Sequence, residues 1–524
     1  MTFSRLFRFL IVVAAVAMVG CAPARVVPPQ ADADVDAFPV QAATETFAVG
    51  YSNIAKKYIE QVSIGELVVE GLRGLGAIDP ALTVRRTENG VALSLVGGEV
   101  ARFDTPDDGD TDAWASLTVD VARAGRTASS ELKDASVEDI YEAVFDGVLS
   151  RLDRFSRYAG REDAKRNRAR RQGFGGIGIR FNATKGKVRI TEIMEETPAQ
   201  RAGLMVDDLL ISIDGVSVKG LGTKELVARL RGPVETRVVL AVQRDQVADP
   251  LSFDIERAHV IPSTVTDRND DGVLVLKVAR FNQATSRSLS RKIKNARETQ
   301  GDGLKGIVLD LRGNPGGLLK QAVLAADLFL TQGEIVRTRG RHSDSVQFYQ
   351  ARGSDVSQGL PVVVLIDGKS ASAAEITAAG LQDRGRAIVL GTTSFGKGSV
   401  QTVVRLPNDG EITLTWSRFV APSGYILHRL GVHPTICTSG VTAKSADPID
   451  AFLDRKNEGA DVFTAWRSVA FADETLRQKL RASCPAERRG VSGDVKLARR
   501  LIESADLYSR FLGFSNIAAA VAQP

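Results

Sequence analysis

The sequence has few of the residues that bind metals: three cysteines and four histidines among 524 residues. The histidines are spread along the chain, at His259, His342, His428 and His433, and no cluster has the short Cys/His spacing of a structural zinc site. The helical motif of zinc proteases is missing as well. These absences exclude the common Cys/His zinc sites.

Aromatic residues and net charge are also low. Aromatics make up 6% of the chain, and 68 basic against 63 acidic residues leave a net charge of only +5. Without a concentrated basic region that has interleaved aromatics, nucleic acid is a poor candidate partner. The hydrophobic share of 44% and the charged share of 25% are those of globular proteins, so wholesale disorder is excluded. The length predicts three or four domains.

Long apolar runs are missing too. Residues 9–19 are apolar, but a transmembrane helix needs about 20 such residues, and no later segment is apolar enough to span a bilayer. Arg5 and Arg8 precede this run and small residues follow it, which is the pattern of an export signal. We therefore expect residues 1–20 to be a signal peptide.

Met18-Val19-Gly20-Cys21 resembles a bacterial lipoprotein signal, in which the cysteine is acylated. The alternative is an ordinary secretory signal with an incidental cysteine. Lipid on Cys21 would anchor the chain to a membrane of the cell envelope, facing the periplasm, and the lack of Asp directly after it favours the outer membrane. Residues 21–44 would form a tether. In an oxidising compartment Cys437 and Cys484 form either a disulfide or two separate buried thiols.

The rest of the sequence divides into four regions, which together predict a multi-domain α/β protein. Residues 45–171 are mainly helical, with continuous helical spacing over 51–72. Residues 172–258 contain glycines and short strand-like runs around one helix. Residues 259–440 alternate between strands and helices, which is the pattern of an α/β domain. Residues 441–524 are helical and polar.

Three glycine-rich motifs in the third region could carry chemistry. Residues 310–317 follow an apolar strand, so their N–H groups lie at a strand end, as an oxyanion-binding turn requires. In residues 368–375, Ser372 begins a helix and forms a capping box with the glutamate three residues on, unless a nearby base makes it a nucleophile. In residues 393–401, Lys397 is either a solvated turn lysine or a base whose pKa burial lowers toward about 7–8.

The motifs closely resemble the carboxy-terminal processing proteases, also called tail-specific proteases. In that family the nucleophilic Ser and the general-base Lys lie 25 residues apart and a Gln follows the Lys by four, as Ser372, Lys397 and Gln401 do here. The segments that carry the resemblance are Ser370-Ala371-Ser372-Ala373-Ala374-Glu375-Ile376, Leu381-Gln382-Asp383-Arg384-Gly385-Arg386-Ala387, Phe395-Gly396-Lys397-Gly398, and Leu152-Asp153-x-x-Ser156-x-Tyr158. The resemblance covers residues 137–440. It departs at Val234-Glu235-Thr236 and Pro434-Thr435.

The resemblance implies a PDZ domain over 172–258 and a crotonase-like protease core over 259–440. Lys397 would take the proton of Ser372, which attacks a peptide carbonyl near the C-terminus of an envelope protein. The N–H group of Ala373 and that of Gly316 or Gly317 would hold the oxyanion, and Gln401 would orient Lys397. Neither metal nor organic cofactor is implied.

For the PDZ region the resemblance implies that the N–H groups of Gly176, Ile177 and Gly178 grip the substrate's terminal carboxylate. Leu226 and Leu230 would face its terminal side chain, or else belong to the core of the domain. The expected partners are proteins or peptides with a free C-terminus, a membrane and an activating protein. Two other functions remain: a proteolytically silent PDZ scaffold lipoprotein, which intact Ser372 and Lys397 disfavour, and an acyl-group enzyme, which would need a coenzyme A site.

Overall fold

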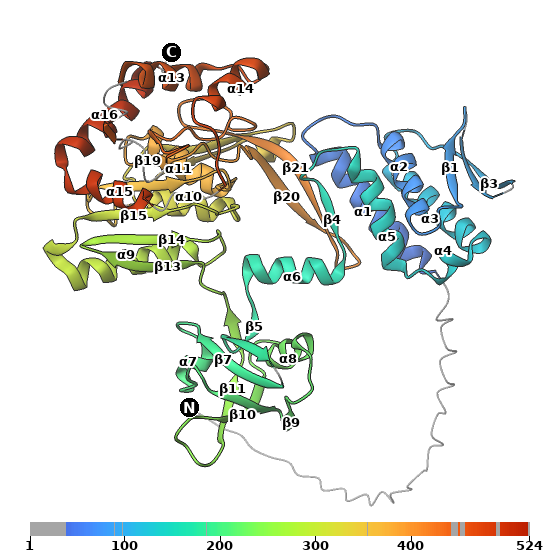
Figure 1. Ribbon diagram of the computed structural model, residues 1–524. Helices are drawn as coiled ribbons and strands as arrows, with labels where there is room; N and C mark the ends of the chain where they lie inside the picture. The colour runs from blue at the N-terminus through green and yellow to red at the C-terminus, as the bar shows by residue number, and fades with distance from the viewer. Residues whose placement is uncertain are drawn as a thin grey trace, which may run out of the picture. The chain divides into compact units, whose positions relative to one another are not determined.

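The computed structural model describes residues 38–521 except 89, 97, 185, 354, 442–448, 451–455 and 489–492 (Figure 1). The expected signal peptide, Cys21 and most of the tether therefore lie outside the described residues. Within the described part of the chain, no helix combines the length and the apolar character needed to cross a membrane.

The N-terminal region packs helices around an aromatic cluster, and a three-stranded antiparallel sheet completes it. Its helices are α1 (Val40–Lys57), α2 (Ile64–Arg73), α3 (Thr111–Ala128), α4 (Ser130–Asp134) and α5 (Val137–Ser150), and its strands are β1 (Thr83–Arg86), β2 (Gly90–Leu95) and β3 (Gly98–Asp104). The continuous helix expected over 51–72 is wrong, because α1 ends at Lys57 and the Ser63 side chain caps a new helix by accepting from the N–H of Glu66.

The second region is a sheet of strand order β11-β10-β8-β7-β6, with the short helix α8 (Thr223–Leu230) packed against it. The strands are β6 (Ile179–Thr184), β7 (Lys187–Ile193), β8 (Leu209–Ile213), β10 (Arg237–Gln243) and β11 (Leu251–Glu256), and β9 (Val216–Ser217) pairs with β8. Two short strands, β5 (Phe174–Gly176) and β12 (Ala258–Val260), pair where the chain enters and leaves the region. Strand β6 is at the edge, so it can accept a further strand.

The third region is built on a six-stranded sheet of order β13-β14-β15-β18-β19-β22. Strand β13 (Val265–Asp270) is antiparallel, and β14 (Val273–Val278), β15 (Gly306–Asp310), β18 (Val362–Ile366), β19 (Ile388–Gly391) and β22 (Ile436–Cys437) are parallel. Leu309 and Val308 of β15 belong to different hydrophobic clusters, one on each face of the sheet. Both faces are covered, as parallel sheets require.

Helices from two parts of the chain provide that cover. The larger cluster includes side chains of α9 (Thr285–Gln300), α10 (Leu319–Asp327) and α11 (Ala373–Asp383). The other face is covered by α15 (Asp494–Glu503) and α16 (Ala505–Val521), through residues such as Leu501 and Phe511. The C-terminal region is therefore helical, as expected, and it completes the core of the α/β domain.

A second sheet, of order β17-β16-β21-β20, lies beside the parallel one in the chain's third region. Its strands are β16 (Glu334–Arg339), β17 (Gln347–Gln350), β20 (Ser399–Arg405) and β21 (Glu411–Val420), and β4 (Arg157–Ala159) pairs with β21. Helix α6 (Arg161–Gln172) follows β4, and its Arg168 and Arg171 both pair with the buried Glu411. The residues that lead into the second region are thus attached to the core.

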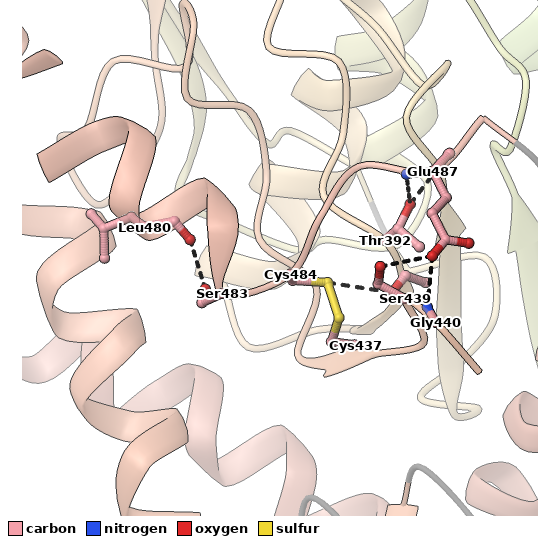
Figure 2. Close-up of a disulfide and its surroundings, with 9 residues drawn as sticks. Thr392, Cys437, Ser439, Gly440, Leu480, Ser483, Cys484 and Glu487 are labelled. Carbon is pink, nitrogen blue, oxygen red and sulfur yellow. Dashed lines mark hydrogen bonds between the residues drawn. A yellow bond between two sulfur atoms is a disulfide. The ribbon is translucent and has the colours of Figure 1, made fainter. Parts of the chain in front are cut away.

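A disulfide joins Cys437 of β22 to Cys484, which follows α14 (Glu474–Ala482) (Figure 2). Of the two alternatives that the sequence left open, the disulfide is therefore the one formed. Around it, the Glu487 side chain accepts hydrogen bonds from Ser439 Oγ at 2.8 Å and Gly440 N at 2.6 Å. The segment after α14 is thereby held against the end of the core sheet. Helix α13 (Lys456–Ser468) comes before α14 in the chain.

Candidate active site

The three glycine-rich motifs follow three neighbouring parallel strands. Residues 310–317 follow β15, residues 368–375 follow β18, and the segment with Lys397 follows β19. Because the carboxyl ends of parallel strands share one edge, the motifs meet there. Hydrogen bonds lock them together: the N–H of Ala371 donates to the carbonyl of Asn314 at 2.9 Å, and that of Phe395 donates to the carbonyl of Ser370 at 3.0 Å.

Ser372 lies at the start of α11 in an unusual backbone conformation, with φ of 56° and ψ of −113°. A positive φ is uncommon for a residue with a side chain and persists only where the surroundings enforce it. Both neighbours, Ala371 and Ala373, are buried, whereas Ser372 itself is partly exposed. The fold thus presents the Ser372 side chain at the strand edge at the expense of local backbone strain.

Glu375 connects the serine loop to the lysine loop. Its Oε2 atom accepts hydrogen bonds from the N–H groups of both Ser372, at 2.7 Å, and Lys397, at 2.9 Å. Its Oε1 atom accepts from Gly396 N at 2.7 Å and Ser394 Oγ at 2.5 Å. The side chain is fully buried, and burial raises the pKa of the carboxyl against the opposing effect of these donors. The sequence identified Glu375 only as half of a capping box.

The turn over residues 310–317 brings Gly316 against Ser372. A Cβ atom on Gly316 would lie 2.8 Å from the Cβ of Ser372 and 3.0 Å from the nitrogen of Ala373, so the close approach requires glycine. The Gly316 N–H already donates to Asn314 Oδ1 at 2.8 Å. The Gly316 carbonyl accepts from Phe281 N at 3.0 Å, and in a trans peptide the next N–H points the opposite way. The Gly317 N–H therefore points away from Phe281.

Ala373 supplies a second N–H group beside Ser372, in addition to that of Gly317. As the first residue of α11, it has no carbonyl partner inside the helix. The sequence left either Gly316 or Gly317 as the source of the second oxyanion-binding N–H group. The Gly316 N–H already donates to Asn314, so the geometry favours the N–H of Gly317. Because this choice depends on which N–H groups already have partners, no sequence pattern could have made it.

Lys397 lies in a tight, largely buried loop between β19 and β20. A Cβ on Gly398 would lie 2.0 Å from the backbone nitrogen of His428, so only glycine fits beside the lysine. Lys397 Nζ is 4.7 Å from the centre of the Phe155 ring. Burial, followed by the charge of Arg157, lowers the pKa of Lys397 from 10.5 to about 8. At pH 7 about a tenth of the amine is then neutral, far more than at the ordinary lysine pKa, and this favours a role as base.

Gln401 lies on β20, close to the lysine loop, but no hydrogen bond joins it to Lys397 among the described contacts. Its Nε2 atom donates to Ser399 Oγ at 2.9 Å and to Thr415 Oγ1 at 3.3 Å, and Thr415 Oγ1 donates in turn to Asp153 Oδ1 at 3.1 Å. A side-chain amide accepts only through its carbonyl oxygen, so this atom of Gln401 is the one that can accept from an amine.

The glycine loop of the second region leads into the edge strand β6. The carbonyl of Ile177 accepts from Ala199 N at 2.8 Å, and that of Gly178 accepts from Met194 N at 2.9 Å. Gly178 has φ of 89° and packs on Thr197, whereas Gly176 ends β5. In contrast, Leu226 and Leu230 of α8 are 0% and 5% exposed within the hydrophobic cluster of the domain. Their burial favours the core alternative for both leucines.

The C-terminal region contacts all three loops of the site. Asp494 of α15 pairs with Arg312 of the glycine turn, with 3.1 Å between Oδ2 and Nη1. The carbonyl of Glu487 accepts from Gly368 N at 2.6 Å, and Arg481 Nη2 donates to the carbonyl of Ser394 at 3.1 Å. Sequence patterns could not predict these contacts, because the residues that make them are ordinary polar residues of a helical tail.

Comparison with known proteins identifies the family. The model of Peptidase family S41 matches residues 272–438, which hold all three motifs, and a PDZ domain model matches residues 189–244. A carboxy-terminal-processing protease of Bartonella bacilliformis is 39% identical over 301 residues, which are 57% of this chain and 69% of that protein. This chain belongs to the carboxy-terminal-processing protease family.

Other relatives cover similar parts of the chain. A probable CtpA-like serine protease of Staphylococcus saprophyticus is 30% identical over 306 residues, which are 58% of this chain and 61% of that protein. One of Staphylococcus aureus is 32% identical over 317 residues, which are 59% of this chain and 62% of that protein. Among solved structures, a photosystem II D1 C-terminal processing protease is 24% identical, with a TM-score of 0.35 and coverage of 61% of this chain and 91% of that one. The chain is a serine-type peptidase with a PDZ domain, as the resemblance implied.

Proposed function

We propose that this peptidase cleaves envelope proteins near their C-termini with Ser372 as nucleophile and Lys397 as general base. The observation that carries the assignment is that one oxygen of the Glu375 carboxylate, Oε2, accepts hydrogen bonds from the backbone N–H groups of both residues. A buried carboxylate in that position fixes the two loops relative to each other, which a nucleophile–base pair requires. No observation favours a silent scaffold.

In the proposed mechanism the neutral Lys397 amine takes the proton of Ser372 Oγ as this oxygen attacks the scissile carbonyl. The Ala373 and Gly317 N–H groups hold the oxyanion of the tetrahedral intermediate, where each donor contributes about 10²–10³ in rate. As the intermediate collapses, the ammonium of Lys397 returns the proton to the leaving amine. Lys397 then takes a proton from the water that attacks the acyl-enzyme, and returns it to Ser372 Oγ as the ester bond breaks and the acid product leaves. Gln401 orients the amine through its carbonyl oxygen.

The substrate's C-terminal residues would bind the PDZ domain by adding a strand to the free edge of β6. The N–H groups of Gly176, Ile177 and Gly178 would then receive the terminal carboxylate, which they favour because it is charged. Since Leu226 and Leu230 are core residues, their contribution to the groove is limited to shaping its floor.

The proposed location is the periplasmic side of the cell envelope, with lipid on Cys21 as the anchor. This proposal is supported by the sequence around Cys21. Several acyl chains hold a protein firmly at a membrane, at about 0.8 kcal/mol per buried CH₂. Mass spectrometry of the membrane fraction should find an acylated N-terminal Cys21, and Cys21→Ser should release an active enzyme; an unmodified Cys21 on soluble wild-type protein would refute the anchor. An activating partner protein also remains a proposal.

The experiment that tests the function uses two peptides that differ only at the C-terminus, one a free acid and one an amide. The wild-type protein should cleave the acid with the higher kcat/KM, and Ser372→Ala should cleave neither. Equal cleavage of both peptides would show that the PDZ domain does not recognise the carboxylate. Substantial cleavage by Ser372→Ala would refute the nucleophile.

A further inference from the structure

One wall of the Lys397 site comes from a segment distant in sequence, residues 153–156, between α5 and β4. The ring of Phe155 lies with its centre 4.7 Å from Lys397 Nζ. The same ring contacts the Arg154 guanidinium at 4.7 Å, and the His428 ring meets it edge-on at 6.3 Å. The Phe155 ring therefore contacts the amine and also two side chains that are not part of the proposed reaction.

A hydrogen-bonded turn fixes the position of this ring. Asp153 Oδ1 accepts from the N–H groups of Phe155, at 2.7 Å, and Ser156, at 3.1 Å, and from Thr415 Oγ1 at 3.1 Å. Ser156 Oγ donates to Asp153 Oδ2 at 2.9 Å and accepts from the N–H of Thr415 at 3.2 Å. The turn is thus attached to β21, the neighbour of the strand that follows Lys397 and carries Gln401.

We propose that Phe155 is a positioning residue for Lys397, whose ring covers the Nζ atom, excludes water from it and holds the amine in the catalytic loop. The proposal rests on the proposed function, because it assigns a purpose to a neutral Lys397. It also explains why a partly buried aromatic residue from outside the core region lies over the amine.

Two effects of the ring on the lysine oppose each other. Covering the amine removes water and disfavours the ammonium, whereas the face of the ring attracts the ammonium. The charged groups around Lys397 also act in both directions: Arg157 and Arg154 lower its pKa, whereas Glu375 and Asp153 raise it. Burial is the largest of the causes that lower the pKa to about 8. We therefore expect the loss of cover to outweigh the loss of attraction.

The test is the pH dependence of kcat/KM of the full-length protein on a peptide with a free C-terminus. The rate should rise through the Lys397 pKa, near 8 in the wild type. In Phe155→Ala the rising limb should move up by about one pH unit, which lowers kcat/KM at pH 7 about tenfold. Phe155→Leu keeps an apolar cover and should keep the limb close to its wild-type position. Phe348→Ala, which removes an exposed ring on β17, is the control and should change neither quantity.

Phe155→Val, a milder truncation, serves if the alanine variant fails to fold, and it should move the limb in the same direction by less. The proposal would be overturned if the rising limb of the pH profile stays in place or moves down in whichever of Phe155→Ala and Phe155→Val folds. A fall in kcat/KM without that upward shift indicates a purely structural role for Phe155. Ser372→Ala is measured in parallel. If Ser372→Ala still cleaves the peptide, the proposed function fails. If Ser372→Ala is inactive but the rising limb does not move in the Phe155 variants, only the role of Phe155 fails.

Discussion

Lys397 is the residue at which function and stability oppose each other most directly. As the proposed general base, its amine must lose its proton near neutral pH, and burial of the side chain beside Phe155 lowers its pKa toward that range. The same burial penalises the ammonium in the folded state. The serine has a comparable disadvantage, since Ser372 is held at a positive φ.

This opposition predicts that Lys397→Met stabilises the protein at pH 7. The pKa of Lys397 is about 8 in the folded protein and 10.5 in the unfolded chain. Between these pH values the unfolded chain binds one proton more than the folded protein, so stability rises with pH across that window. The full cost of burying the ammonium is therefore present below pH 8. The variant should unfold with a free energy higher by at most about 3 kcal/mol at pH 7, and the gain should shrink toward pH 10.5. Chemical denaturation at both pH values checks this. A destabilised variant at pH 7 would contradict it.

The residue types at the site were predictable from the sequence, but their partners were not. Spacing and the family resemblance identified Ser372, Lys397 and Gln401, and the family was confirmed. Phe155 was missed because its contact with Lys397 joins segments far apart in the chain, and nothing in its local sequence separates it from an ordinary core aromatic. The same holds for the choice of Gly317 over Gly316, which depends on a hydrogen bond from Gly316 to Asn314.

At the scale of elements, the start of α11 and the loop before β20 behave as one unit because Glu375 accepts hydrogen bonds from both. Local patterns predicted the helix start and the strand–helix alternation of the parallel sheet. They did not predict that α1 and α2 are separate helices, since helical spacing continues across the break that Ser63 caps. They also did not predict that β4 pairs with β21, which is a long-range pairing.

Glu375→Gln should weaken this unit. An amide places an NH₂ donor among groups that all donate, so at least one buried N–H or hydroxyl loses its acceptor, at about 1–3 kcal/mol. We expect kcat to fall about 100-fold or more, with a lower melting temperature. Glu411→Gln is the matched control, because Glu411 is another buried carboxylate, paired with Arg168 and Arg171. It should lower stability while kcat stays within a few-fold of wild type; equal kcat in both variants would contradict the role of Glu375.

Across the whole molecule, the S41 match ends at residue 438, yet the chain beyond it is part of the active enzyme's structure. Helices α15 and α16 cover one face of the parallel sheet, and Asp494, Glu487 and Arg481 contact the three glycine-rich loops of the candidate site. The sequence indicated helices here but not their position, because amphipathic helices do not specify which surface they cover. The Cys437–Cys484 disulfide joins this region to the last strand of the sheet.

Removing that disulfide with Cys437→Ser and Cys484→Ser should destabilise the protein. The bond closes a loop over a sequence separation of 47 residues, which in the loop-entropy model corresponds to about 3–4 kcal/mol. The melting temperature of the double variant should match that of the wild type treated with a reductant, and the reductant should leave the variant unchanged. A double variant as stable as the oxidised wild type would contradict a stabilising role.

In the proposed mechanism, Ser372 and Lys397 act as one catalytic unit. The most direct measurement is kcat/KM for Ser372→Ala, Lys397→Ala and the double variant on a peptide with a free C-terminal carboxylate. Groups that act together lose their effect together, so each single variant should lose about 10⁴–10⁶ in rate and the double variant should be no slower than the slower single one. Losses that multiply in the double variant, or substantial cleavage by Ser372→Ala, would show that the two residues do not form a catalytic unit.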